Sequence, residues 1–355
     1  MKNISKKNNF DLIRLLAAAQ VVLGHSLEHL KINEGYLFDL YENFLKYFPG
    51  VPIFFFLSGF LIYWSYDRNN NLRQYLKNRL LRIYPALWFC TLLTVILLVY
   101  FSDKTMVTLF NFSTFYLWLI GQVTFFQFYT PDIIRFWGVS TPNGSLWTVI
   151  VELQYYISVP LIYYILKFNK KYILLLIITS IFINIFINGL NNNSIYTKIL
   201  QLQLFPYLYY FLFGILFYLF WDKIQKMIQN KFLIWFTVYV IFTIICNGIF
   251  KLDTFSYWVN TPFKLINDII LCFTVFSFSF SYTLMSDKLL KGNDISYGIY
   301  IYHMLVVNIF VELKFFSNSS YLFLMFVIVV LISIFSWFFI EQPCLKLKHK
   351  KFLVK

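Results

Sequence analysis

The most regular feature of the sequence is a series of apolar runs, each about twenty residues long, separated by short polar segments. About twenty apolar residues cross the hydrocarbon core of a bilayer as an α-helix. A transmembrane β-barrel would show alternating segments of about ten residues instead, and lipid tolerates only these two structures because every backbone polar group must be paired. The pattern therefore predicts an all-α, polytopic membrane protein.

Ten of the apolar runs are expected to cross the membrane. They lie at about 10–30, 47–66, 85–101, 144–166, 171–189, 199–220, 231–250, 263–284, 295–312 and 320–340. An eleventh apolar stretch, 109–130, is rich in aromatic residues but is interrupted by polar ones such as Asn111, Gln122 and Gln127. Whether this stretch crosses decides on which side every later loop lies.

The distribution of Lys and Arg indicates whether the eleventh stretch crosses the membrane. If 109–130 does not cross, the side of the N-terminus carries 21 of the 30 basic residues and the opposite side carries 8; if it crosses, the split becomes 13 against 16. Because cytoplasmic loops are enriched in Lys and Arg, we expect ten spans with both termini in the cytoplasm. We expect 109–130 to be re-entrant or interfacial, residues 1–345 to form one membrane domain, and 346–355 to form a basic cytoplasmic tail.

Composition excludes several other classes. Hydrophobic residues make up 59% of the 355 residues and charged residues 13%, about half the charged share of a soluble domain, so a soluble enzyme and a disordered chain are excluded. The net charge of +14 comes from short clusters between apolar runs, which is typical of cytoplasmic loops rather than of a nucleic-acid-binding face. The four cysteines have no Cys or His nearby at metal-ligand spacing, so we infer neither a disulfide framework nor a metal site.

Ionisable residues within the expected spans are candidates for function, because each costs about 2.5–3.5 kcal/mol on insertion. Arg14 and His25 are eleven residues apart in the first span. This spacing places both on one face of a helix, with His25 about 16 Å nearer the outer side. The structural alternatives are snorkelling of Arg14 to the interface, helped by Asp11, and an interhelical hydrogen bond for His25.

Glu152 is the candidate partner of His25. It is expected about 10 Å below the outer end of its span and His25 about 8 Å below, so the two could meet. A carboxylate beside an imidazole fixes the tautomer and raises the basicity that a general base needs; a structural network with Tyr or Trp is the alternative. His303 and Asp268 are weaker candidates for function, because polar contacts between helices could explain them. The apolar run around Ser58 is predicted to be a helix-packing surface.

Arg79 and Arg82 lie three residues apart at the cytoplasmic entry to the third span, close to Arg68, Arg73 and Lys77. A pair of guanidinium groups suits phosphate, which each can grip with two hydrogen bonds. Ordinary anchoring by the positive-inside rule is the alternative.

Together these segments resemble the acyltransferase-3 family, membrane O-acyltransferases that modify bacterial surface polysaccharides. In chain order the matching segments are Asp11-Leu12-Ile13-Arg14-Leu15-Leu16-Ala17 with His25, Pro52-Ile53-Phe54-Phe55-Phe56-Leu57-Ser58-Gly59-Phe60, Arg79-x-x-Arg82 with Ile83-Tyr84-Pro85, Ser145-Leu146-Trp147 with Glu152 and Tyr156, Ile295-Ser296-Tyr297-Gly298-Ile299-Tyr300 with His303, and Glu341-Gln342-Pro343. The order of all six segments along the chain makes the resemblance specific.

The resemblance implies an enzyme of the bacterial cytoplasmic membrane that transfers an acetyl group from cytoplasmic acetyl-CoA to a sugar hydroxyl. The acceptor would be a surface polysaccharide such as O-antigen, or its undecaprenyl-linked precursor. The resemblance implies catalysis for His25, an essential role for Arg14 in the same helix, and binding of the donor's phosphates by Arg79 and Arg82. The depth of Glu152 adds it as the catalytic partner of His25, and Arg14 is expected along the path of the donor's acyl arm. Further candidate site residues are Ser58, Asp268, Tyr297 and His303. No permanently bound cofactor and no nucleic-acid partner are expected.

Two alternatives to acetyl transfer stay open. One is transfer of succinyl or another acyl group. The other is a transporter or flippase for a lipid-linked glycan or small solute, which could use the same intramembrane charges. Many transporters contain inverted repeats, and the sequence shows none.

The basic-residue count generates a topology prediction. Reporter fusions at Lys104 and Arg135 should both report the outer side of the membrane, because the segment between them is expected not to cross. If the two fusions report opposite sides, 109–130 is a span and the ten-span arrangement is wrong.

Overall fold

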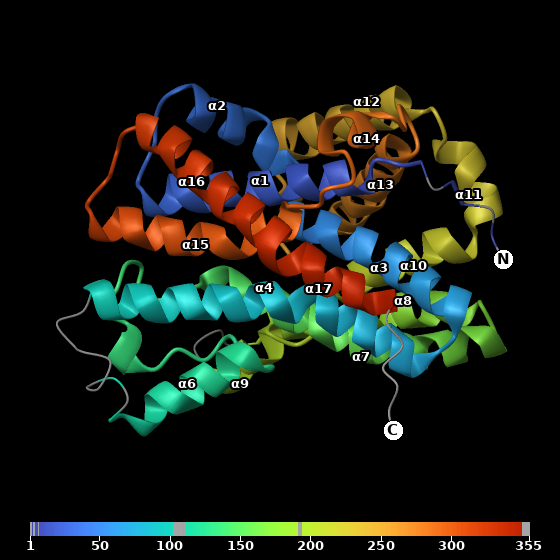
Figure 1. Cartoon of the computed structure of the whole chain (residues 1–355). Coiled ribbons are helices and arrows are strands. Elements are labelled where there is room, and N and C mark those ends of the chain that lie inside the picture. The colour runs from blue at the N-terminus through green and yellow to red at the C-terminus, as the bar shows by residue number, and fades with distance from the viewer. Residues whose placement is uncertain are drawn as a thin grey trace, which may run out of the picture. The chain divides into compact units, whose positions relative to one another are not determined.

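The computed structural model describes residues 2, 4–5, 7–101, 109, 111–190 and 194–349, and all regular secondary structure in these ranges is helical (Figure 1). The all-α prediction is thus confirmed for the described residues. Lys104, and the tail lysines Lys350, Lys351 and Lys355, lie outside them, so the expected basic tail stays a prediction.

Contacts between residues divide the chain into two compact units, each assembled from segments that are far apart in sequence. The first unit comprises Met1–Ala17, Leu45–Asn71 and Gln154–Asn293, and the second unit comprises Ala18–Phe44, Leu72–Leu153 and Asp294–Lys355. The long helices α1 (Phe10–His29) and α7 (Trp147–Phe168) contribute residues to both units.

The remaining helices of the first unit surround an aromatic core. They are α3 (Gly50–Asn69), α8 (Tyr172–Asn188), α9 (Ile195–Gln201), α10 (Leu208–Leu219), α11 (Trp221–Ile228), α12 (Phe232–Thr243), α13 (Pro262–Ser279) and α14 (Met285–Leu290), with short 3₁₀ turns at Leu45–Tyr47 and Phe205–Tyr207 and a π-helical end on α12 at Ile244–Ile249.

Two glycines set the closest approach in the first unit, between α3 and α10. A Cβ on Gly59 would lie 1.9 Å from the carbonyl oxygen of Phe211, and a Cβ on Gly214 would lie 2.1 Å from the carbonyl oxygen of Phe56. Any side chain at either position would force the two backbones apart. The apolar run around Ser58 is therefore a packing surface, as its periodicity predicted.

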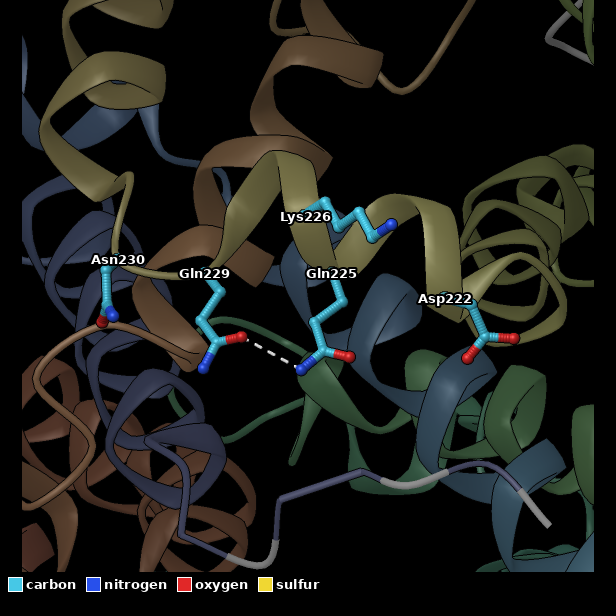
Figure 2. Close-up of a pocket in the computed structure, with 5 residues that line it drawn as sticks. All are labelled: Asp222, Gln225, Lys226, Gln229 and Asn230. Atoms are coloured by element: carbon cyan, nitrogen blue, oxygen red, sulfur yellow. Dashed lines mark hydrogen bonds between the residues drawn. The ribbon is translucent and has the colours of Figure 1, made fainter.

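Helix α11 is short and amphipathic. Trp221, Ile224 and Ile228 are buried at the spacing of one helical face. The opposite face lines an open hollow on the surface, shown in Figure 2, whose residues are Asp222, Gln225, Lys226, Gln229 and Asn230. Gln225 donates a hydrogen bond of 3.0 Å to Gln229 across this face. None of the residues singled out in the sequence lines this hollow, so it is not the candidate site.

The second unit contains α2 (Tyr36–Asn43), α4 (Leu72–Phe101), α6 (Ser113–Val123), α15 (Ser296–Glu312), α16 (Ser320–Ser336) and α17 (Gln342–Lys346). Short 3₁₀ and π-helical segments join them at Asp132–Ile134, Gly144–Leu146, Trp337–Glu341 and Leu347–His349.

Helix α15 is the central element of the second unit. Thirteen of its 17 residues are buried, and it packs against α4 and α16 (Figure 1). Gly298 permits the contact with α16, because a Cβ there would lie 3.0 Å from the Cβ of Ser333. The helix therefore provides a rigid backbone for any side chain it carries.

Six helices in the described ranges are long and apolar enough to span a membrane, and eight if two pairs of helices joined at a bend each count as one span. The six are Phe10–His29, Leu72–Phe101, Gly144–Phe168, Phe232–Ile249, Pro262–Ser279 and Ser320–Lys346. Of the ten predicted spans, α8 and α15 fall short: each has 17 residues, or about 25 Å of helix against a hydrocarbon core of about 30 Å. The protein is a multi-pass membrane protein, and the count of ten spans stays a prediction.

Residues 111–130, the described part of the eleventh stretch apart from 109, contain one short helix followed by a turn. Helix α6 has 11 residues, about 16 Å in length, which is too short to cross hydrocarbon. The two glutamines that interrupt the apolar pattern close the turn, because Gln122 and Gln127 each donate to the other's backbone carbonyl at 3.2 Å. A re-entrant or interfacial position for this segment stays a prediction.

Candidate functional site

Two histidines from distant parts of the sequence meet in the second unit. Nδ1 of His25, on α1, lies 2.9 Å from Nε2 of His303, on α15. The two rings are nearly parallel, with centroids 5.2 Å apart and an interplanar angle of 25°. His303 is fully buried, whereas His25 is half-buried. The residue that the sequence indicated as a polar helix contact is therefore the direct partner of the candidate catalytic histidine.

The surrounding backbone determines which nitrogens carry protons. Nδ1 of His303 lies 2.6 Å from the carbonyl oxygen of Tyr300, which can only accept, so this nitrogen must be the donor. In a neutral imidazole the other nitrogen is then an acceptor, so Nε2 of His303 accepts the proton of Nδ1 of His25. The Nε2 of His25 is left with its lone pair, which is the state that a general base requires.

Helix α15 is held by hydrogen bonds on both sides of His303. The hydroxyl of Tyr300 lies 2.8 Å from that of Thr148, and Asn143 donates to the carbonyl oxygen of Ile301 at 2.7 Å. Further out, the side chain of Asn308 accepts from the backbone of Val139 at 2.7 Å. These bonds fix the ring of His303 through the backbone that carries it.

The roles expected for Glu152 and Arg14 stay predictions. Glu152 is half-buried on α7 and makes interactions of its own, and the one proton on Nδ1 of His25 is engaged by His303. A role for Glu152 elsewhere at the site stays a prediction. Arg14 forms an ion pair with Asp11 at 2.7 Å, both side chains being partly exposed, in the arrangement that snorkelling predicts.

Ser58 and Asp268 belong to the first unit. Asp268 is fully buried and forms an ion pair with the buried Lys264 of the preceding turn. Its second oxygen accepts a hydrogen bond of 3.0 Å from Tyr209, and Lys264 also donates to Tyr210 at 3.2 Å. A buried, saturated ion pair of this kind accounts for Asp268 without a catalytic role.

The two candidate donor-binding arginines, Arg79 and Arg82, differ in their neighbours, and those of Arg82 lie near the N-terminal end of α15. Arg82 forms an ion pair with Asp294 and lies 4.0 Å from Glu341. The hydroxyl of Tyr297, another sequence candidate, donates to the carbonyl oxygen of Ile83 at 3.3 Å. The structure thus surrounds Arg82 with acidic partners, which the sequence alone did not reveal.

Arg79 lies on the same helix and shares a basic neighbour, Lys348, with Arg82. Its guanidinium lies 5.8 Å from the ring centre of Tyr75, and the segment Leu347–His349 packs against the same helix α4, with Gln74 donating to the carbonyl oxygen of Lys348 at 3.1 Å. Burial, together with the positive charges of Arg82 and Arg79, lowers the pKa of Lys348 from 10.5 to about 8. A lysine predicted only as a membrane anchor therefore lies close to a candidate phosphate ligand.

Sequence reasoning missed several residues that the structure brings to these sites. Glu341 lay inside a quoted segment and Asp294 directly preceded another, but neither was given a role, although a charge at the end of an apolar run is a usable signal. His29 also escaped attention; its ring centroid lies 6.0 Å from that of His25, one helical turn away. In the described ranges no group of three or more His, Cys, Asp or Glu is placed to hold a metal ion.

Comparisons with known proteins agree with this resemblance. Residues 7–339 match the model of the acyltransferase-3 family, described as an acyltransferase domain. Nodulation protein 10 of Rhizobium leguminosarum bv. viciae is 30% identical over 363 residues, covering 96% of this chain and 94% of that protein. An O-acetyl transferase of Shigella phage Sf6 is 28% identical over 341 residues, covering 95% of this chain and 96% of that protein.

A third relative is similar over a shorter stretch. The peptidoglycan O-acetyltransferase OatA of Listeria monocytogenes is 28% identical over 119 residues, which cover 32% of this chain and 19% of OatA. No solved structure matches the chain significantly.

The buried pair of Lys264 and Asp268 generates a stability prediction. Asp268→Asn should lower the free energy of unfolding by about 3–5 kcal/mol, because it leaves the lysine charge buried without its partner. The double variant Lys264→Met with Asp268→Leu should lose much less, since it removes both charges. Thermal unfolding of the purified proteins in detergent measures both effects, and equal losses in the two variants would show that the ion pair is not the determinant.

Proposed function

The chain belongs to the acyltransferase-3 family, and we propose that it transfers an acetyl group from cytoplasmic acetyl-CoA to a sugar hydroxyl of a bacterial surface glycan. The acceptor is the glycan itself or its undecaprenyl-linked precursor, and the location is the cytoplasmic membrane with both chain termini inside. Relatives described as an O-acetyl transferase and as a peptidoglycan O-acetyltransferase support this reaction and this class of acceptor.

The observation that carries the proposal is the pair of His25 and His303. Nε2 of His25 removes the proton of the acceptor hydroxyl as its oxygen attacks the thioester carbonyl of acetyl-CoA. The new C–O bond forms, the C–S bond breaks, and the proton passes from His25 to the sulfur, which leaves as the thiol of CoA. No atom is gained or lost and His25 returns to its neutral state.

In this mechanism His303 is a positioning residue. Its Nε2 holds the proton of His25 on Nδ1, so that Nε2 of His25 faces the substrate as a base. It also stabilises the imidazolium that forms during attack, because the lone pair on Nε2 of His303 accepts from the charged ring. The carbonyl oxygen of Tyr300 keeps this polarity fixed.

The donor's phosphates are placed at the cytoplasmic end of the second unit. Arg79 and Lys348 supply positive charge there, and Arg73 and Lys77 lie within the same stretch of α4. The acyl arm extends from this end towards His25. The role of Arg14, expected near the arm from the family resemblance, is part of the same proposal.

The decisive experiment measures transfer of radiolabel from acetyl-CoA to glycan in membranes that contain the protein. His25→Ala should reduce transfer by about 10²- to 10⁴-fold, the usual contribution of a general base. His303→Leu should cause a smaller loss in the maximal rate with little change in the KM for acetyl-CoA, because it disturbs the base and not the donor site.

His29→Gln is the matched control for these two variants. It changes an imidazole one helical turn from His25 and should leave transfer close to the wild-type rate. Label reaching glycan from succinyl-CoA but not from acetyl-CoA would establish a different acyl group. Normal transfer in His25→Ala would contradict the assignment of the base, and no transfer from any acyl-CoA would favour a transporter.

The depressed pKa of Lys348 generates a prediction on pH. The ammonium is charged below about pH 8 and loses its proton as the pH rises through that value, so affinity for CoA should fall between pH 7 and 9. The expected loss is about tenfold, the value of one charge-assisted hydrogen bond. Calorimetry with CoA and purified protein measures it.

Lys348→Arg provides the control for this measurement, because arginine stays charged across the range. This variant should bind CoA with nearly constant affinity after correction for the ionisation of CoA itself. If wild type and variant lose affinity equally, Lys348 does not contact the phosphates.

A further inference from the structure

Arg82 has acidic partners at both ends of its guanidinium group. One terminal nitrogen forms an ion pair with Asp294, and the other lies 4.0 Å from Glu341. The side chains are 20%, 10% and 2% exposed in that order, so the group is largely withdrawn from solvent. Asp294 engages one end of the guanidinium group, which leaves fewer of its N–H donors for a phosphate ligand.

Asp294 connects Arg82 to the first turn of α15. Its Oδ2 receives the arginine, while its Oδ1 accepts hydrogen bonds from the backbone N–H of Ser296, at 3.2 Å, and from the Ser296 hydroxyl. A carboxylate that accepts from the first backbone N–H groups of a helix stabilises that end. One side chain therefore links α4 to the start of the helix that carries His303.

Glu341 makes a second connection to the same helix. Its Oε1 accepts from the hydroxyl of Ser336 at 3.1 Å, and that hydroxyl lies 2.7 Å from the hydroxyl of Tyr302 on α15. The hydroxyl of Tyr302 also lies 3.3 Å from the carbonyl oxygen of Ala86 on α4. Arg82 thus lies between two short chains of polar contacts, and both end on α15.

The position of α15 determines the geometry of the two histidines. His303 follows Asp294 by nine residues, about 13 Å along the axis, and the intervening helix is almost completely buried. A small rotation or shift of its first turn would therefore move the imidazole. Catalytic geometry has to be held within about 0.5 Å, and a misplacement of about 1 Å can cost about 10²-fold in rate.

We infer that Arg82 is a positioning residue for the reaction, which fixes the first turn of α15 and thereby holds His303 against His25, and that it is not a ligand of the donor's phosphates. The inference rests on the proposed role of His25. It assigns different roles to two arginines that the sequence presents as equivalent. Arg79 binds the donor, and Arg82 maintains the catalytic geometry.

The test compares three Arg→Lys variants with one acid variant. Arg82→Lys keeps the charge but loses the planar fork that reaches both carboxylates, and Asp294→Asn removes the charge on the other side of the ion pair. Arg79→Lys is the contrasting variant at the donor site. Arg135→Lys, on a partly exposed side chain paired with Asp132, is the control for the exchange of residue type.

The kinetic outcome distinguishes positioning from donor binding. Arg82→Lys and Asp294→Asn should each lower the maximal rate of acetyl transfer by about 10- to 100-fold, with the KM for acetyl-CoA and the Kd for CoA within twofold of wild type. Their double variant should be little worse than either single one, because both break the same link. Arg79→Lys should raise KM and Kd, and Arg135→Lys should change neither.

Hydrogen exchange tests the same inference without any substrate. Backbone amides of residues 295–303 should exchange at least tenfold faster in Arg82→Lys and Asp294→Asn than in wild type, while Arg79→Lys and Arg135→Lys keep wild-type protection. This readout decides the positioning role even if acetyl transfer is not the reaction. Failure of the proposed function would appear separately, as no transfer by the wild-type protein.

Two results would overturn the inference. One is an increase in KM and Kd in Arg82→Lys equal to that in Arg79→Lys, which would show that Arg82 binds the donor's phosphates. The other is unchanged exchange of residues 295–303 in both Arg82→Lys and Asp294→Asn, which would show that the ion pair does not hold α15.

Discussion

A neutral imidazole has one proton for two nitrogens, and in this protein the carbonyl oxygen of Tyr300 determines where that proton lies on His303. Nε2 of His303 must then accept, so Nδ1 of His25 donates across the 2.9 Å contact between the two nitrogens. Nε2 of His25 keeps its lone pair and is the basic nitrogen. A carboxylate orients the histidine in many hydrolases; here a backbone carbonyl and a second imidazole have that role. Two neutral rings bury no charge of their own, and burying an isolated charge is costly.

This arrangement requires a helix that does not move. Helix α15 meets the requirement by burial and by polar bonds at three levels: Asp294 at its start, Tyr300 and the Ile301 carbonyl near its middle, and Asn308 towards its C-terminal end. Each of these groups would be costly to bury alone and is stabilising only because it is paired. The polar residues that interrupt the apolar sequence of α15 are thus the residues that hold the helix in place.

Much of the fold could be predicted from the sequence, because apolar runs of helical length determine helices in lipid almost by themselves. The sequence could not establish the count of spans, since α8 and α15 have only 17 residues each. His25 stood out as a polar group in an apolar run. His303 was a candidate as well, but its pairing with His25 could not be predicted, because 278 residues separate the two and only the tertiary fold brings them together. For the same reason the sequence did not reveal the acidic partners of Arg82 and could not distinguish Arg82 from Arg79.

The most direct test of the account is the protonation of the two imidazoles in the folded protein. Protein labelled with ¹⁵N-histidine and held in lipid vesicles near pH 7 should give two neutral rings, each protonated on Nδ1, after assignment by single substitutions. A scalar coupling should connect Nδ1 of His25 to Nε2 of His303 across their hydrogen bond. A proton on Nε2 of His25, or rings that show no coupling, would contradict the claim that His303 prepares His25 as the base.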